Sequence, residues 1–212
     1  MIDYIFDIDG TLWDPTAVCT RAYTAAAVEW MQEHDWVPEE VFRISEDLMR
    51  RQFGKPISEV RDNLFWPFPM EARNDMIRKV DRIQIEMIKA DPPPAFDGTE
   101  ETLQYLCDQG NKLFIVSNCE AGYIPTMLEC TGLRPYFTDM IAYADTGLLK
   151  ADNLKLIIER NNLQNPVYIG DTLGDEIATH KAGIPYCFAA YGFGESENPE
   201  RVINDIRELC DS

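Results

Sequence analysis

The chain has 212 residues, of which 45% are hydrophobic, enough for one large domain or two small ones with a full apolar core. Its 19 Lys and Arg against 37 Asp and Glu give a net charge of −18, and it has no membrane-length apolar run, so we expect neither nucleic acid nor a membrane as a partner. Six scattered cysteines and only two histidines argue against a zinc site and favour reduced thiols in the cytoplasm.

Apolar, β-rich segments that end in small or polar residues predict five strands: Ile2–Phe6, Lys112–Ser117, Met140–Ala144, Val167–Gly170 and Tyr186–Ala190. Helical patterns alternate with the later strands: Thr99–Gln109, Ala121–Thr131, Asp152–Asn162 and Asp175–Ala182. Strands that alternate with short helices are typical of right-handed βαβ units. We therefore expect an α/β fold with a Rossmann-like parallel sheet.

A long helical stretch interrupts this alternation after the first strand. More than a hundred residues separate the first two strands, and the stiff run Pro92–Pro94 closes the stretch. The helices predicted within it are Ala17–Glu33, Glu39–Phe53, Ile57–Asn63 and Met70–Lys89. We expect residues 15–91 to form an all-helical cap subdomain inserted into an α/β core of residues 1–14 and 92–212. The alternative is that these helices pack onto the sheet as part of one core.

Polar residues collect where the predicted strands end, which is the edge at which parallel sheets bind ligands. Because side chains alternate along a strand, Asp7 and Asp9 would point the same way. Carboxylates this close resist joint ionisation, and a bound cation relieves them; hard oxygen ligands favour magnesium. The later strand ends add further polar groups: Ser117 and Asn118, then Lys150, then Asp171 and Asp175.

This set of side chains fits phosphoryl transfer through an aspartyl intermediate. Asp7 would attack phosphorus, and Asp9 would protonate the leaving alkoxide and later deprotonate water. Magnesium held by Asp7 and Asp171 would neutralise charge on the phosphoryl group. Taken singly, these residues could mark a turn, a surface lysine or a helix cap; their ordered recurrence at strand ends favours the chemistry. The remaining phosphoryl oxygens would be bound by Ser117, Lys150 and backbone N–H groups near Gly10 and Asn118.

The segment Asp7-Ile8-Asp9-Gly10-Thr11 resembles the first motif of the haloacid dehalogenase superfamily of hydrolases. Ser117 matches the second motif, Lys150 the third and Gly170-Asp171-x-x-x-Asp175 the fourth, so the resemblance covers the whole chain. The long insertion is similar to the helical cap of the phosphoglycolate phosphatase-like branch.

The resemblance implies a role for each matched residue. Asp7 would be the nucleophile and Asp9 the acid–base, with the Asp9 carbonyl also on magnesium. Lys150 would assist catalysis. The implied metal site comprises Asp7, Asp9, Asp171 and, in support, Asp175. The implied phosphate-binding residues are Gly10, Thr11, Ser117, Asn118 and Lys150.

Two details refine this interpretation. Phosphatases and phosphomutases of the family carry the acid found here at Asp9, whereas its dehalogenases lack it because halide leaves without a proton. The family commonly has a proline after the lysine of the third motif, where a proline can start a helix. Here Ala151 follows Lys150, and we expect Asp152 to cap the helix instead.

The function we expect is a magnesium-dependent phosphatase that hydrolyses a small soluble phosphate monoester. A sugar phosphomutase similar to β-phosphoglucomutase could use the same Asp7 and Asp9, provided that its cap excluded water. Remoter alternatives are a signalling receiver, which would phosphorylate an acid after an interior strand, and a catalytically silent phosphate-binding or partner-binding protein.

Three further features have a functional and an ordinary interpretation. In the loop Gly54-Lys55-Pro56, Lys55 could attract an anionic leaving group, or it could simply be a solvated lysine. Cys119 could suggest a thiol mechanism, but no histidine lies near it in the sequence. The tryptophans are expected to pack in the core or the cap: Trp13, Trp30, Trp36 and Trp66.

Overall fold

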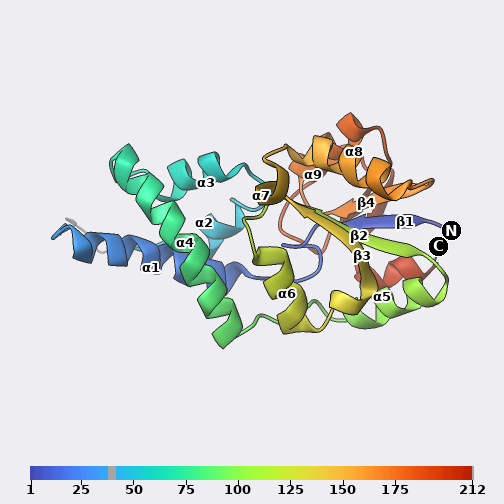
Figure 1. The fold of residues 1–212 in the computed structure, drawn as a ribbon, viewed down its shortest axis with the longest axis horizontal. Coiled ribbons are helices and arrows are strands. Elements are labelled where there is room, and N and C mark those ends of the chain that lie inside the picture. Colours follow the sequence, from blue (N-terminus) through green and yellow to red (C-terminus); the bar gives the residue numbers. More distant parts are fainter. Residues whose placement is uncertain (38–41, 212) are drawn as a thin grey trace.

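A six-stranded parallel sheet forms the centre of the fold in the computed structural model, which describes residues 1–37 and 42–211 (Figure 1). In the order β3-β2-β1-β4-β5-β6, the first strand lies between β2 and β4, and Phe6 pairs with both Ile115 and Ile169. The α/β prediction with a Rossmann-like parallel sheet is therefore confirmed. The strands are β1 (Asp3–Phe6), β2 (Lys112–Ser117), β3 (Phe137–Ala142), β4 (Pro166–Gly170), β5 (Tyr186–Ala189) and β6 (Arg201–Ile203).

Helices cover both faces of the sheet, so the strands are apolar on both sides. On one face, Ile5 and Phe114 belong to an apolar cluster with Leu154 and Ala178 of α8 and α9. The alternate strand residues form the other cluster, with α5 and α6. These helices are α5 (Thr99–Asp108), α6 (Tyr123–Thr131), the one-turn α7 (Tyr143–Thr146), α8 (Lys150–Asn161) and α9 (Leu173–Ala182), with 3-10 segments at Arg134–Tyr136 and Ile206–Asp211.

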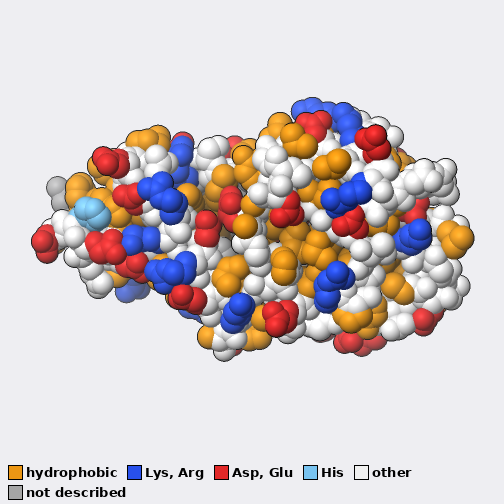
Figure 2. Space-filling model, in the orientation of Figure 1, with side chains coloured by type: hydrophobic (Ala, Val, Ile, Leu, Met, Phe, Trp, Pro, Cys, Tyr) orange, Lys and Arg blue, Asp and Glu red, His pale blue; other side chains and the backbone are white. Residues whose placement is uncertain are grey.

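A helical segment between β1 and β2 lies beyond one end of the sheet (Figure 1). Its long helices α1 and α4 pack together, and Lys79 of α4 lies 2.8 Å from carboxylate oxygens of both Glu29 and Glu33 of α1. Acidic and basic side chains are interspersed over the visible face of this segment (Figure 2). Among the described residues, no helix is long and apolar enough to cross a membrane. The helices are α1 (Thr16–Glu33), α2 (Glu46–Arg50), α3 (Ile57–Leu64) and α4 (Met70–Ala90).

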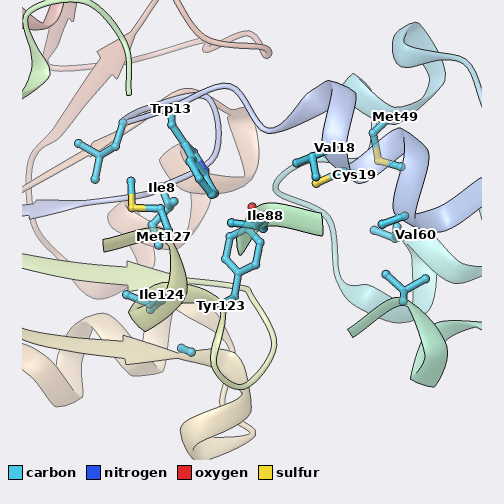
Figure 3. Close-up of a cluster of buried hydrophobic side chains, with 14 of the residues drawn as sticks. Ile8, Trp13, Val18, Cys19, Met49, Val60, Ile88, Tyr123, Ile124 and Met127 are labelled. Atoms are coloured by element: carbon cyan, nitrogen blue, oxygen red, sulfur yellow. The ribbon is translucent and has the colours of Figure 1, made fainter. Parts of the chain in front are cut away.

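The apolar packing is continuous between the helical segment and the sheet. In Figure 3, Ile8, Trp13 and Met127 from the sheet side belong to the same buried cluster as Val18 and Val60 from the helical segment. Both parts thus share buried surface, as one core would. The division into a cap of residues 15–91 and a core of residues 1–14 and 92–212 stays a prediction.

The strand predictions need two corrections. The third strand is Phe137–Ala142 rather than Met140–Ala144, because the Asp145 carboxylate accepts a 2.7 Å hydrogen bond from the Ala142 N–H and starts α7 there. The sixth strand, Arg201–Ile203, was not predicted; it is three residues long and pairs with β5.

Two predicted helix starts also differ. The prediction Glu39–Phe53 falls partly outside the described residues, and within them the helix is only Glu46–Arg50, which begins after the N-cap Ser45. Asp152 does not cap its helix, because α8 already begins at Lys150 after Leu149. Asp152 instead lies in the first turn, where a negative charge is favourable near the helix N-terminus.

Candidate active site

Asp7 lies at the centre of the carboxyl edge of the sheet. It directly follows β1, and its backbone N–H donates a 2.8 Å hydrogen bond to the Ile169 carbonyl of β4. The residue is 4% exposed, and its Oδ2 lies 3.1 Å from the Lys150 Nζ. Its Oδ1 is buried and has no hydrogen-bond partner among the described residues. One oxygen of this carboxylate is thus held by a cation while the other is uncommitted.

Three acids converge beside this oxygen. Carboxylate oxygens of Asp7, Asp171 and Asp175 all lie within 4.8 Å of one another, and all three residues are buried. Burial raises the pKa of Asp7 and of Asp171, and the neighbouring carboxylates raise both further. Such crowding of buried negative charge is relieved by a hard cation with oxygen ligands. The uncommitted Asp7 Oδ1 and this donor set therefore fit magnesium.

The backbone leaves room for Asp171 at this point. Gly10 has a φ of +80°, and a Cβ there would collide with the Asp171 carboxylate, so only glycine fits the turn. The Asp171 Oδ2 accepts a 2.8 Å hydrogen bond from the Phe193 N–H, and the Thr11 hydroxyl lies 3.5 Å from Oδ1. Asp171 is thereby held from two sides.

Lys150 is the cation that compensates the acids. Its side chain is 4% exposed, and Nζ lies 2.5 Å from the Asp175 Oδ1 in addition to its contact with Asp7. Burial lowers the pKa of Lys150, but the two carboxylates outweigh it and raise the pKa above its usual range. The other oxygen of Asp175 accepts hydrogen bonds from the Thr172 N–H and hydroxyl, in a capping box that begins α9. Asp175 therefore positions both Lys150 and the helix.

Asp9 has a different environment from the other acids. Its Oδ1 accepts hydrogen bonds from the Trp13 Nε1 at 2.7 Å and the Tyr123 hydroxyl at 2.8 Å. Burial raises the pKa of Asp9 to about 7, although these two hydrogen bonds oppose the shift. An acid that titrates near neutrality can both donate and accept a proton. The Asp9 carboxylate lies outside the three-acid cluster, and the contact of the Asp9 carbonyl with the metal stays a prediction.

Trp13 and Tyr123 are contacts of Asp9 that sequence reasoning missed. Trp13 was expected to be core packing; it is fully buried, but it also donates to Asp9. The two rings pack edge to face, with centroids 5.9 Å apart. The spacing of four residues between Asp9 and Trp13 gave a weak local signal, whereas no local pattern connects Tyr123 to Asp9, 114 residues away.

A cavity joins these groups to the helical segment. Its lining includes Asp7, Asp9, Ser117, Asn118 and Lys150, five of the residues predicted from the sequence. Four other predicted residues are not among the described residues that line it: Gly10, Thr11, Asp171 and Asp175. Gly10 leaves room for the Asp171 carboxylate, and the Thr11 hydroxyl lies 3.5 Å from it. Cys119 lines the cavity, but burial raises its thiol pKa well above the usual range, so it is no thiolate nucleophile near neutral pH.

The predicted Lys55 loop forms part of the opposite wall. Lys55 lines the cavity, and its Nζ lies 3.5 Å from both the Glu59 and the Gln52 side-chain oxygens. The preceding residues contact the core: the Gly54 carbonyl is 3.5 Å from the Asn118 Nδ2, and the Phe53 ring is 4.9 Å from that of Phe193, between centroids. The structure thus places Lys55 at the cavity with its charge shared by neighbours.

Comparisons with known proteins agree with this geometry. A family model described as haloacid dehalogenase-like hydrolase matches residues 4–189. The chain is 29% identical to a phosphoglycolate phosphatase from Photobacterium profundum over 55% of each chain. It is 28% identical to one from Shigella boydii over 76% of this chain and 65% of that protein. The matches thus span about half to two thirds of these relatives' length.

A solved structure extends the likeness to the whole fold. The crystal structure of a predicted phosphoglycolate phosphatase from Haemophilus somnus superposes with a TM-score of 0.84, covering 99% of this chain and 96% of that one. Its sequence identity is 18%, so this likeness shows the fold alone.

Proposed function

The chain belongs to the haloacid dehalogenase-like hydrolases, and we propose that it is a magnesium-dependent phosphatase that hydrolyses a small-molecule phosphate monoester. The observation that carries this proposal is the uncommitted Oδ1 of Asp7, beside Lys150 and a second acid, Asp9, in one cavity. Phosphatases among the curated relatives support it.

In the proposed first step, an Asp7 oxygen attacks phosphorus and the bond from phosphorus to the leaving oxygen breaks. Asp9 gives its proton to the departing alkoxide, so that an alcohol leaves and an aspartyl phosphate remains. Asp9 then takes a proton from water, the water oxygen bonds to phosphorus, and the Asp7 carboxylate is released with inorganic phosphate. Lys150 would hold Asp7 in place, and Ser117 and Asn118, which line the same cavity, would bind phosphoryl oxygens.

Asp7 and Asp171 would hold magnesium, with the Asp9 carbonyl as a further ligand and Asp175 in support. Bound magnesium would supply positive charge against the phosphoryl oxygens. Among the described residues, Lys150 is the cationic side chain that pairs with this acid cluster, and burial raises the pKa of two of the three acids. The acid cluster therefore supports the proposed cofactor.

We propose that the helical segment acts as a cap that closes the cavity. Its loop at Phe53 and Gly54 meets Phe193 and Asn118 of the core, and Arg50 lies 3.4 Å from Asp14. A closed cap excludes water while the nucleophile and leaving group react.

The proposed partner is a small phosphorylated molecule. The net charge of −18 supports the absence of a nucleic-acid partner. The six free cysteines support a reducing compartment.

Substitution of Asp7 tests the nucleophile. Asp7→Asn keeps the size of the side chain and removes the attacking carboxylate, so hydrolysis of p-nitrophenyl phosphate should fall to background while the melting curve shows a folded protein. Asp75→Asn is the matched control, because Asp75 is paired with Arg78 on α4 outside the cavity. Near-normal turnover by folded Asp7→Asn would remove Asp7 as nucleophile.

Two further assays complete the test. Activity should disappear in excess chelator and return on addition of magnesium; full activity in metal-free protein would exclude the proposed cofactor. Isomerisation of a glucose phosphate in the presence of a trace of the bisphosphate, faster than release of inorganic phosphate, would favour the phosphomutase alternative.

A further inference from the structure

The leaving-group side of the cavity is acidic. Four side chains from α4 and from the loop after β2 line it there: Asp81, Gln84, Ile85 and Glu120. The two elements lie against each other (Figure 1), and a Cβ at Gly122 would lie 3.6 Å from the Ile85 Cδ1. Residues 81, 84 and 85 are three and four positions apart, so they share one face of the helix. The carboxylates of Asp81 on this face and of Glu120 in the loop after β2 therefore both line the cavity.

Neither carboxylate is neutralised by the part of the chain that the structure describes. Among the described residues, the Asp81 and Glu120 side chains have no ion-pair or hydrogen-bond partner. Asp81 is exposed at the mouth of the cavity and Glu120 is half-buried. The surrounding protein partly desolvates both carboxyl groups: this raises the pKa of Asp81 to about 6, to which the charge of Glu120 adds, and it also raises the pKa of Glu120. A pKa of about 6 leaves Asp81 largely ionised at neutral pH. The two side chains thus form an acidic pair with no cationic partner among the described residues.

The cations of the cavity are already engaged elsewhere. Among the described residues that line it, the cationic side chains are Lys55 and Lys150. Lys150 lies between Asp7 and Asp175, and Lys55 lies 3.5 Å from Glu59. A substrate whose leaving group carried a carboxylate would thus meet two further carboxylates and no unengaged ammonium. Like charges in such a site oppose binding.

Much of the remaining wall is apolar, although Gln52 also lines it, and the space is small. Tyr23, Met49, Val60 and Ile85 line the cavity, which encloses about 100 Å³. An enclosed water needs roughly 10–15 Å³. The cavity therefore has room for a phosphoryl group and a leaving group of only a few atoms. A short carbon chain would contact the apolar wall.

We propose that the substrate is a short aminoalkyl phosphate monoester, whose ammonium group is bound by Asp81 and Glu120. A hydroxyl group could accept or donate a hydrogen bond there, but only a cation neutralises two carboxylates. The inference rests on the proposed phosphatase function, and it differs from the phosphoglycolate named for the curated relatives. Asp81 and Glu120 would determine specificity, and Asp7 and Asp9 the reaction.

Three esters of nearly equal size test the inference: 2-aminoethyl phosphate, 2-hydroxyethyl phosphate and phosphoglycolate. Wild-type kcat/KM should be largest for the ammonium ester and smallest for the carboxylate ester. Asp81→Asn or Glu120→Gln should lower the ratio of kcat/KM for the aminoethyl over the hydroxyethyl ester about tenfold, mainly through KM. The advantage of the aminoethyl ester should also shrink at high salt.

Matched controls isolate the cavity. Asp75→Asn on α4 and Glu129→Gln on α6 lie outside it and should leave this ratio unchanged. Preference for phosphoglycolate, or equal losses for all three esters in the cavity variants, would overturn the aminoalkyl assignment while leaving the phosphatase proposal standing. Failure of wild-type protein to hydrolyse these esters and p-nitrophenyl phosphate alike would overturn both.

Discussion

The two walls of the cavity differ in how their charges are compensated. On the sheet side, the lining residues Lys150 and Asp7 form an ion pair. Asp175 and Asp171 do not line the cavity: Asp175 also contacts Lys150, and Asp171 accepts a hydrogen bond from the Phe193 backbone. On the side of α4, Asp81 has no comparable partner among the described residues. A fixed network holds reacting groups in place before the substrate arrives. A carboxylate without a protein partner can instead interact with the substrate. We therefore assign the reaction to the sheet side of the cavity and substrate selection to the side of α4.

Removal of Lys150 should have the largest effect. Lys150→Met keeps an unbranched apolar stem but leaves Asp7 and Asp175 without their cation, so kcat/KM should fall about a thousandfold. Metal-free protein should also lose about 3 kcal/mol of unfolding free energy, because a buried charge is left unpaired. Kinetics and denaturant unfolding measure both. Lys155→Met, on an exposed position of the same helix, should change neither by much; equal losses in the two variants would contradict the special role of Lys150.

Gly54→Ala tests the contact between the walls. Gly54 has a φ of +79°, and a Cβ there would lie 2.8 Å from the Thr172 Oγ1, so alanine would be strained and would push the loop away from the core. We expect kcat/KM to fall about 30-fold, which corresponds to about 2 kcal/mol against closure. Gly132→Ala is the control, since Gly132 has a φ of +74° and open space around it. An equally large loss for Gly132→Ala would show that backbone strain, and not the lost contact with the core, causes the effect.

Tyr123→Phe should have a smaller effect on the reacting wall. It removes one of the two hydrogen bonds to Asp9 and retains the ring that packs against Trp13. We expect kcat to fall about tenfold for an alkyl ester, whose alkoxide needs a proton. The leaving group of an aryl ester departs without a proton, so Tyr123→Phe should slow formation of the aspartyl phosphate less for such an ester. Tyr136→Phe is the control, because the Tyr136 hydroxyl donates to Glu100 and neither residue lines the cavity. Equal effects on both esters would argue against a role through Asp9.

Lys55→Ala should have the smallest effect. Its ammonium already lies near Glu59 and Gln52, so it has little charge left for a ligand. We expect KM for phosphoglycolate to rise about two- to threefold and KM for p-nitrophenyl phosphate to change less. Lys89→Ala, on the exposed end of α4, serves as the control. No change for either substrate would remove Lys55 from the specificity site.

The sheet-side wall could be predicted because its signals are local. Each strand is an apolar run followed at once by polar residues, so Asp7, Ser117 and Asp171 could be placed at one edge from strand order alone. The third strand was misplaced because its residues 143 and 144 are equally compatible with a helical turn, and Asp145 decides between them. The short β6 carries too few residues for a period-two pattern.

The opposite wall could not be predicted, because its contacts depend on tertiary packing. Asp81 and Glu120 are separated by a strand and a helix, and neither stands in a motif. Likewise, Tyr123 reaches Asp9 only because α6 packs beside the loop after β1. Lys55, singled out by its flanking Gly54 and Pro56, lines the cavity, but its role in specificity stays a prediction. The sequence did not indicate that Glu59 would share its charge.

Direct trapping of the phosphoryl group tests the central claim that Asp7 is the nucleophile. The Asp9→Asn variant should form the aspartyl phosphate from p-nitrophenyl phosphate, whose leaving group needs no proton, and should hydrolyse it slowly for lack of a base. After acid quenching and pepsin digestion at low pH, where an acyl phosphate survives, mass spectrometry should find one phosphoryl group in a peptide that contains Asp7, on Asp7 and labile to hydroxylamine. Turnover with no phosphoryl group on that peptide, or a hydroxylamine-resistant group on another residue, would contradict the account.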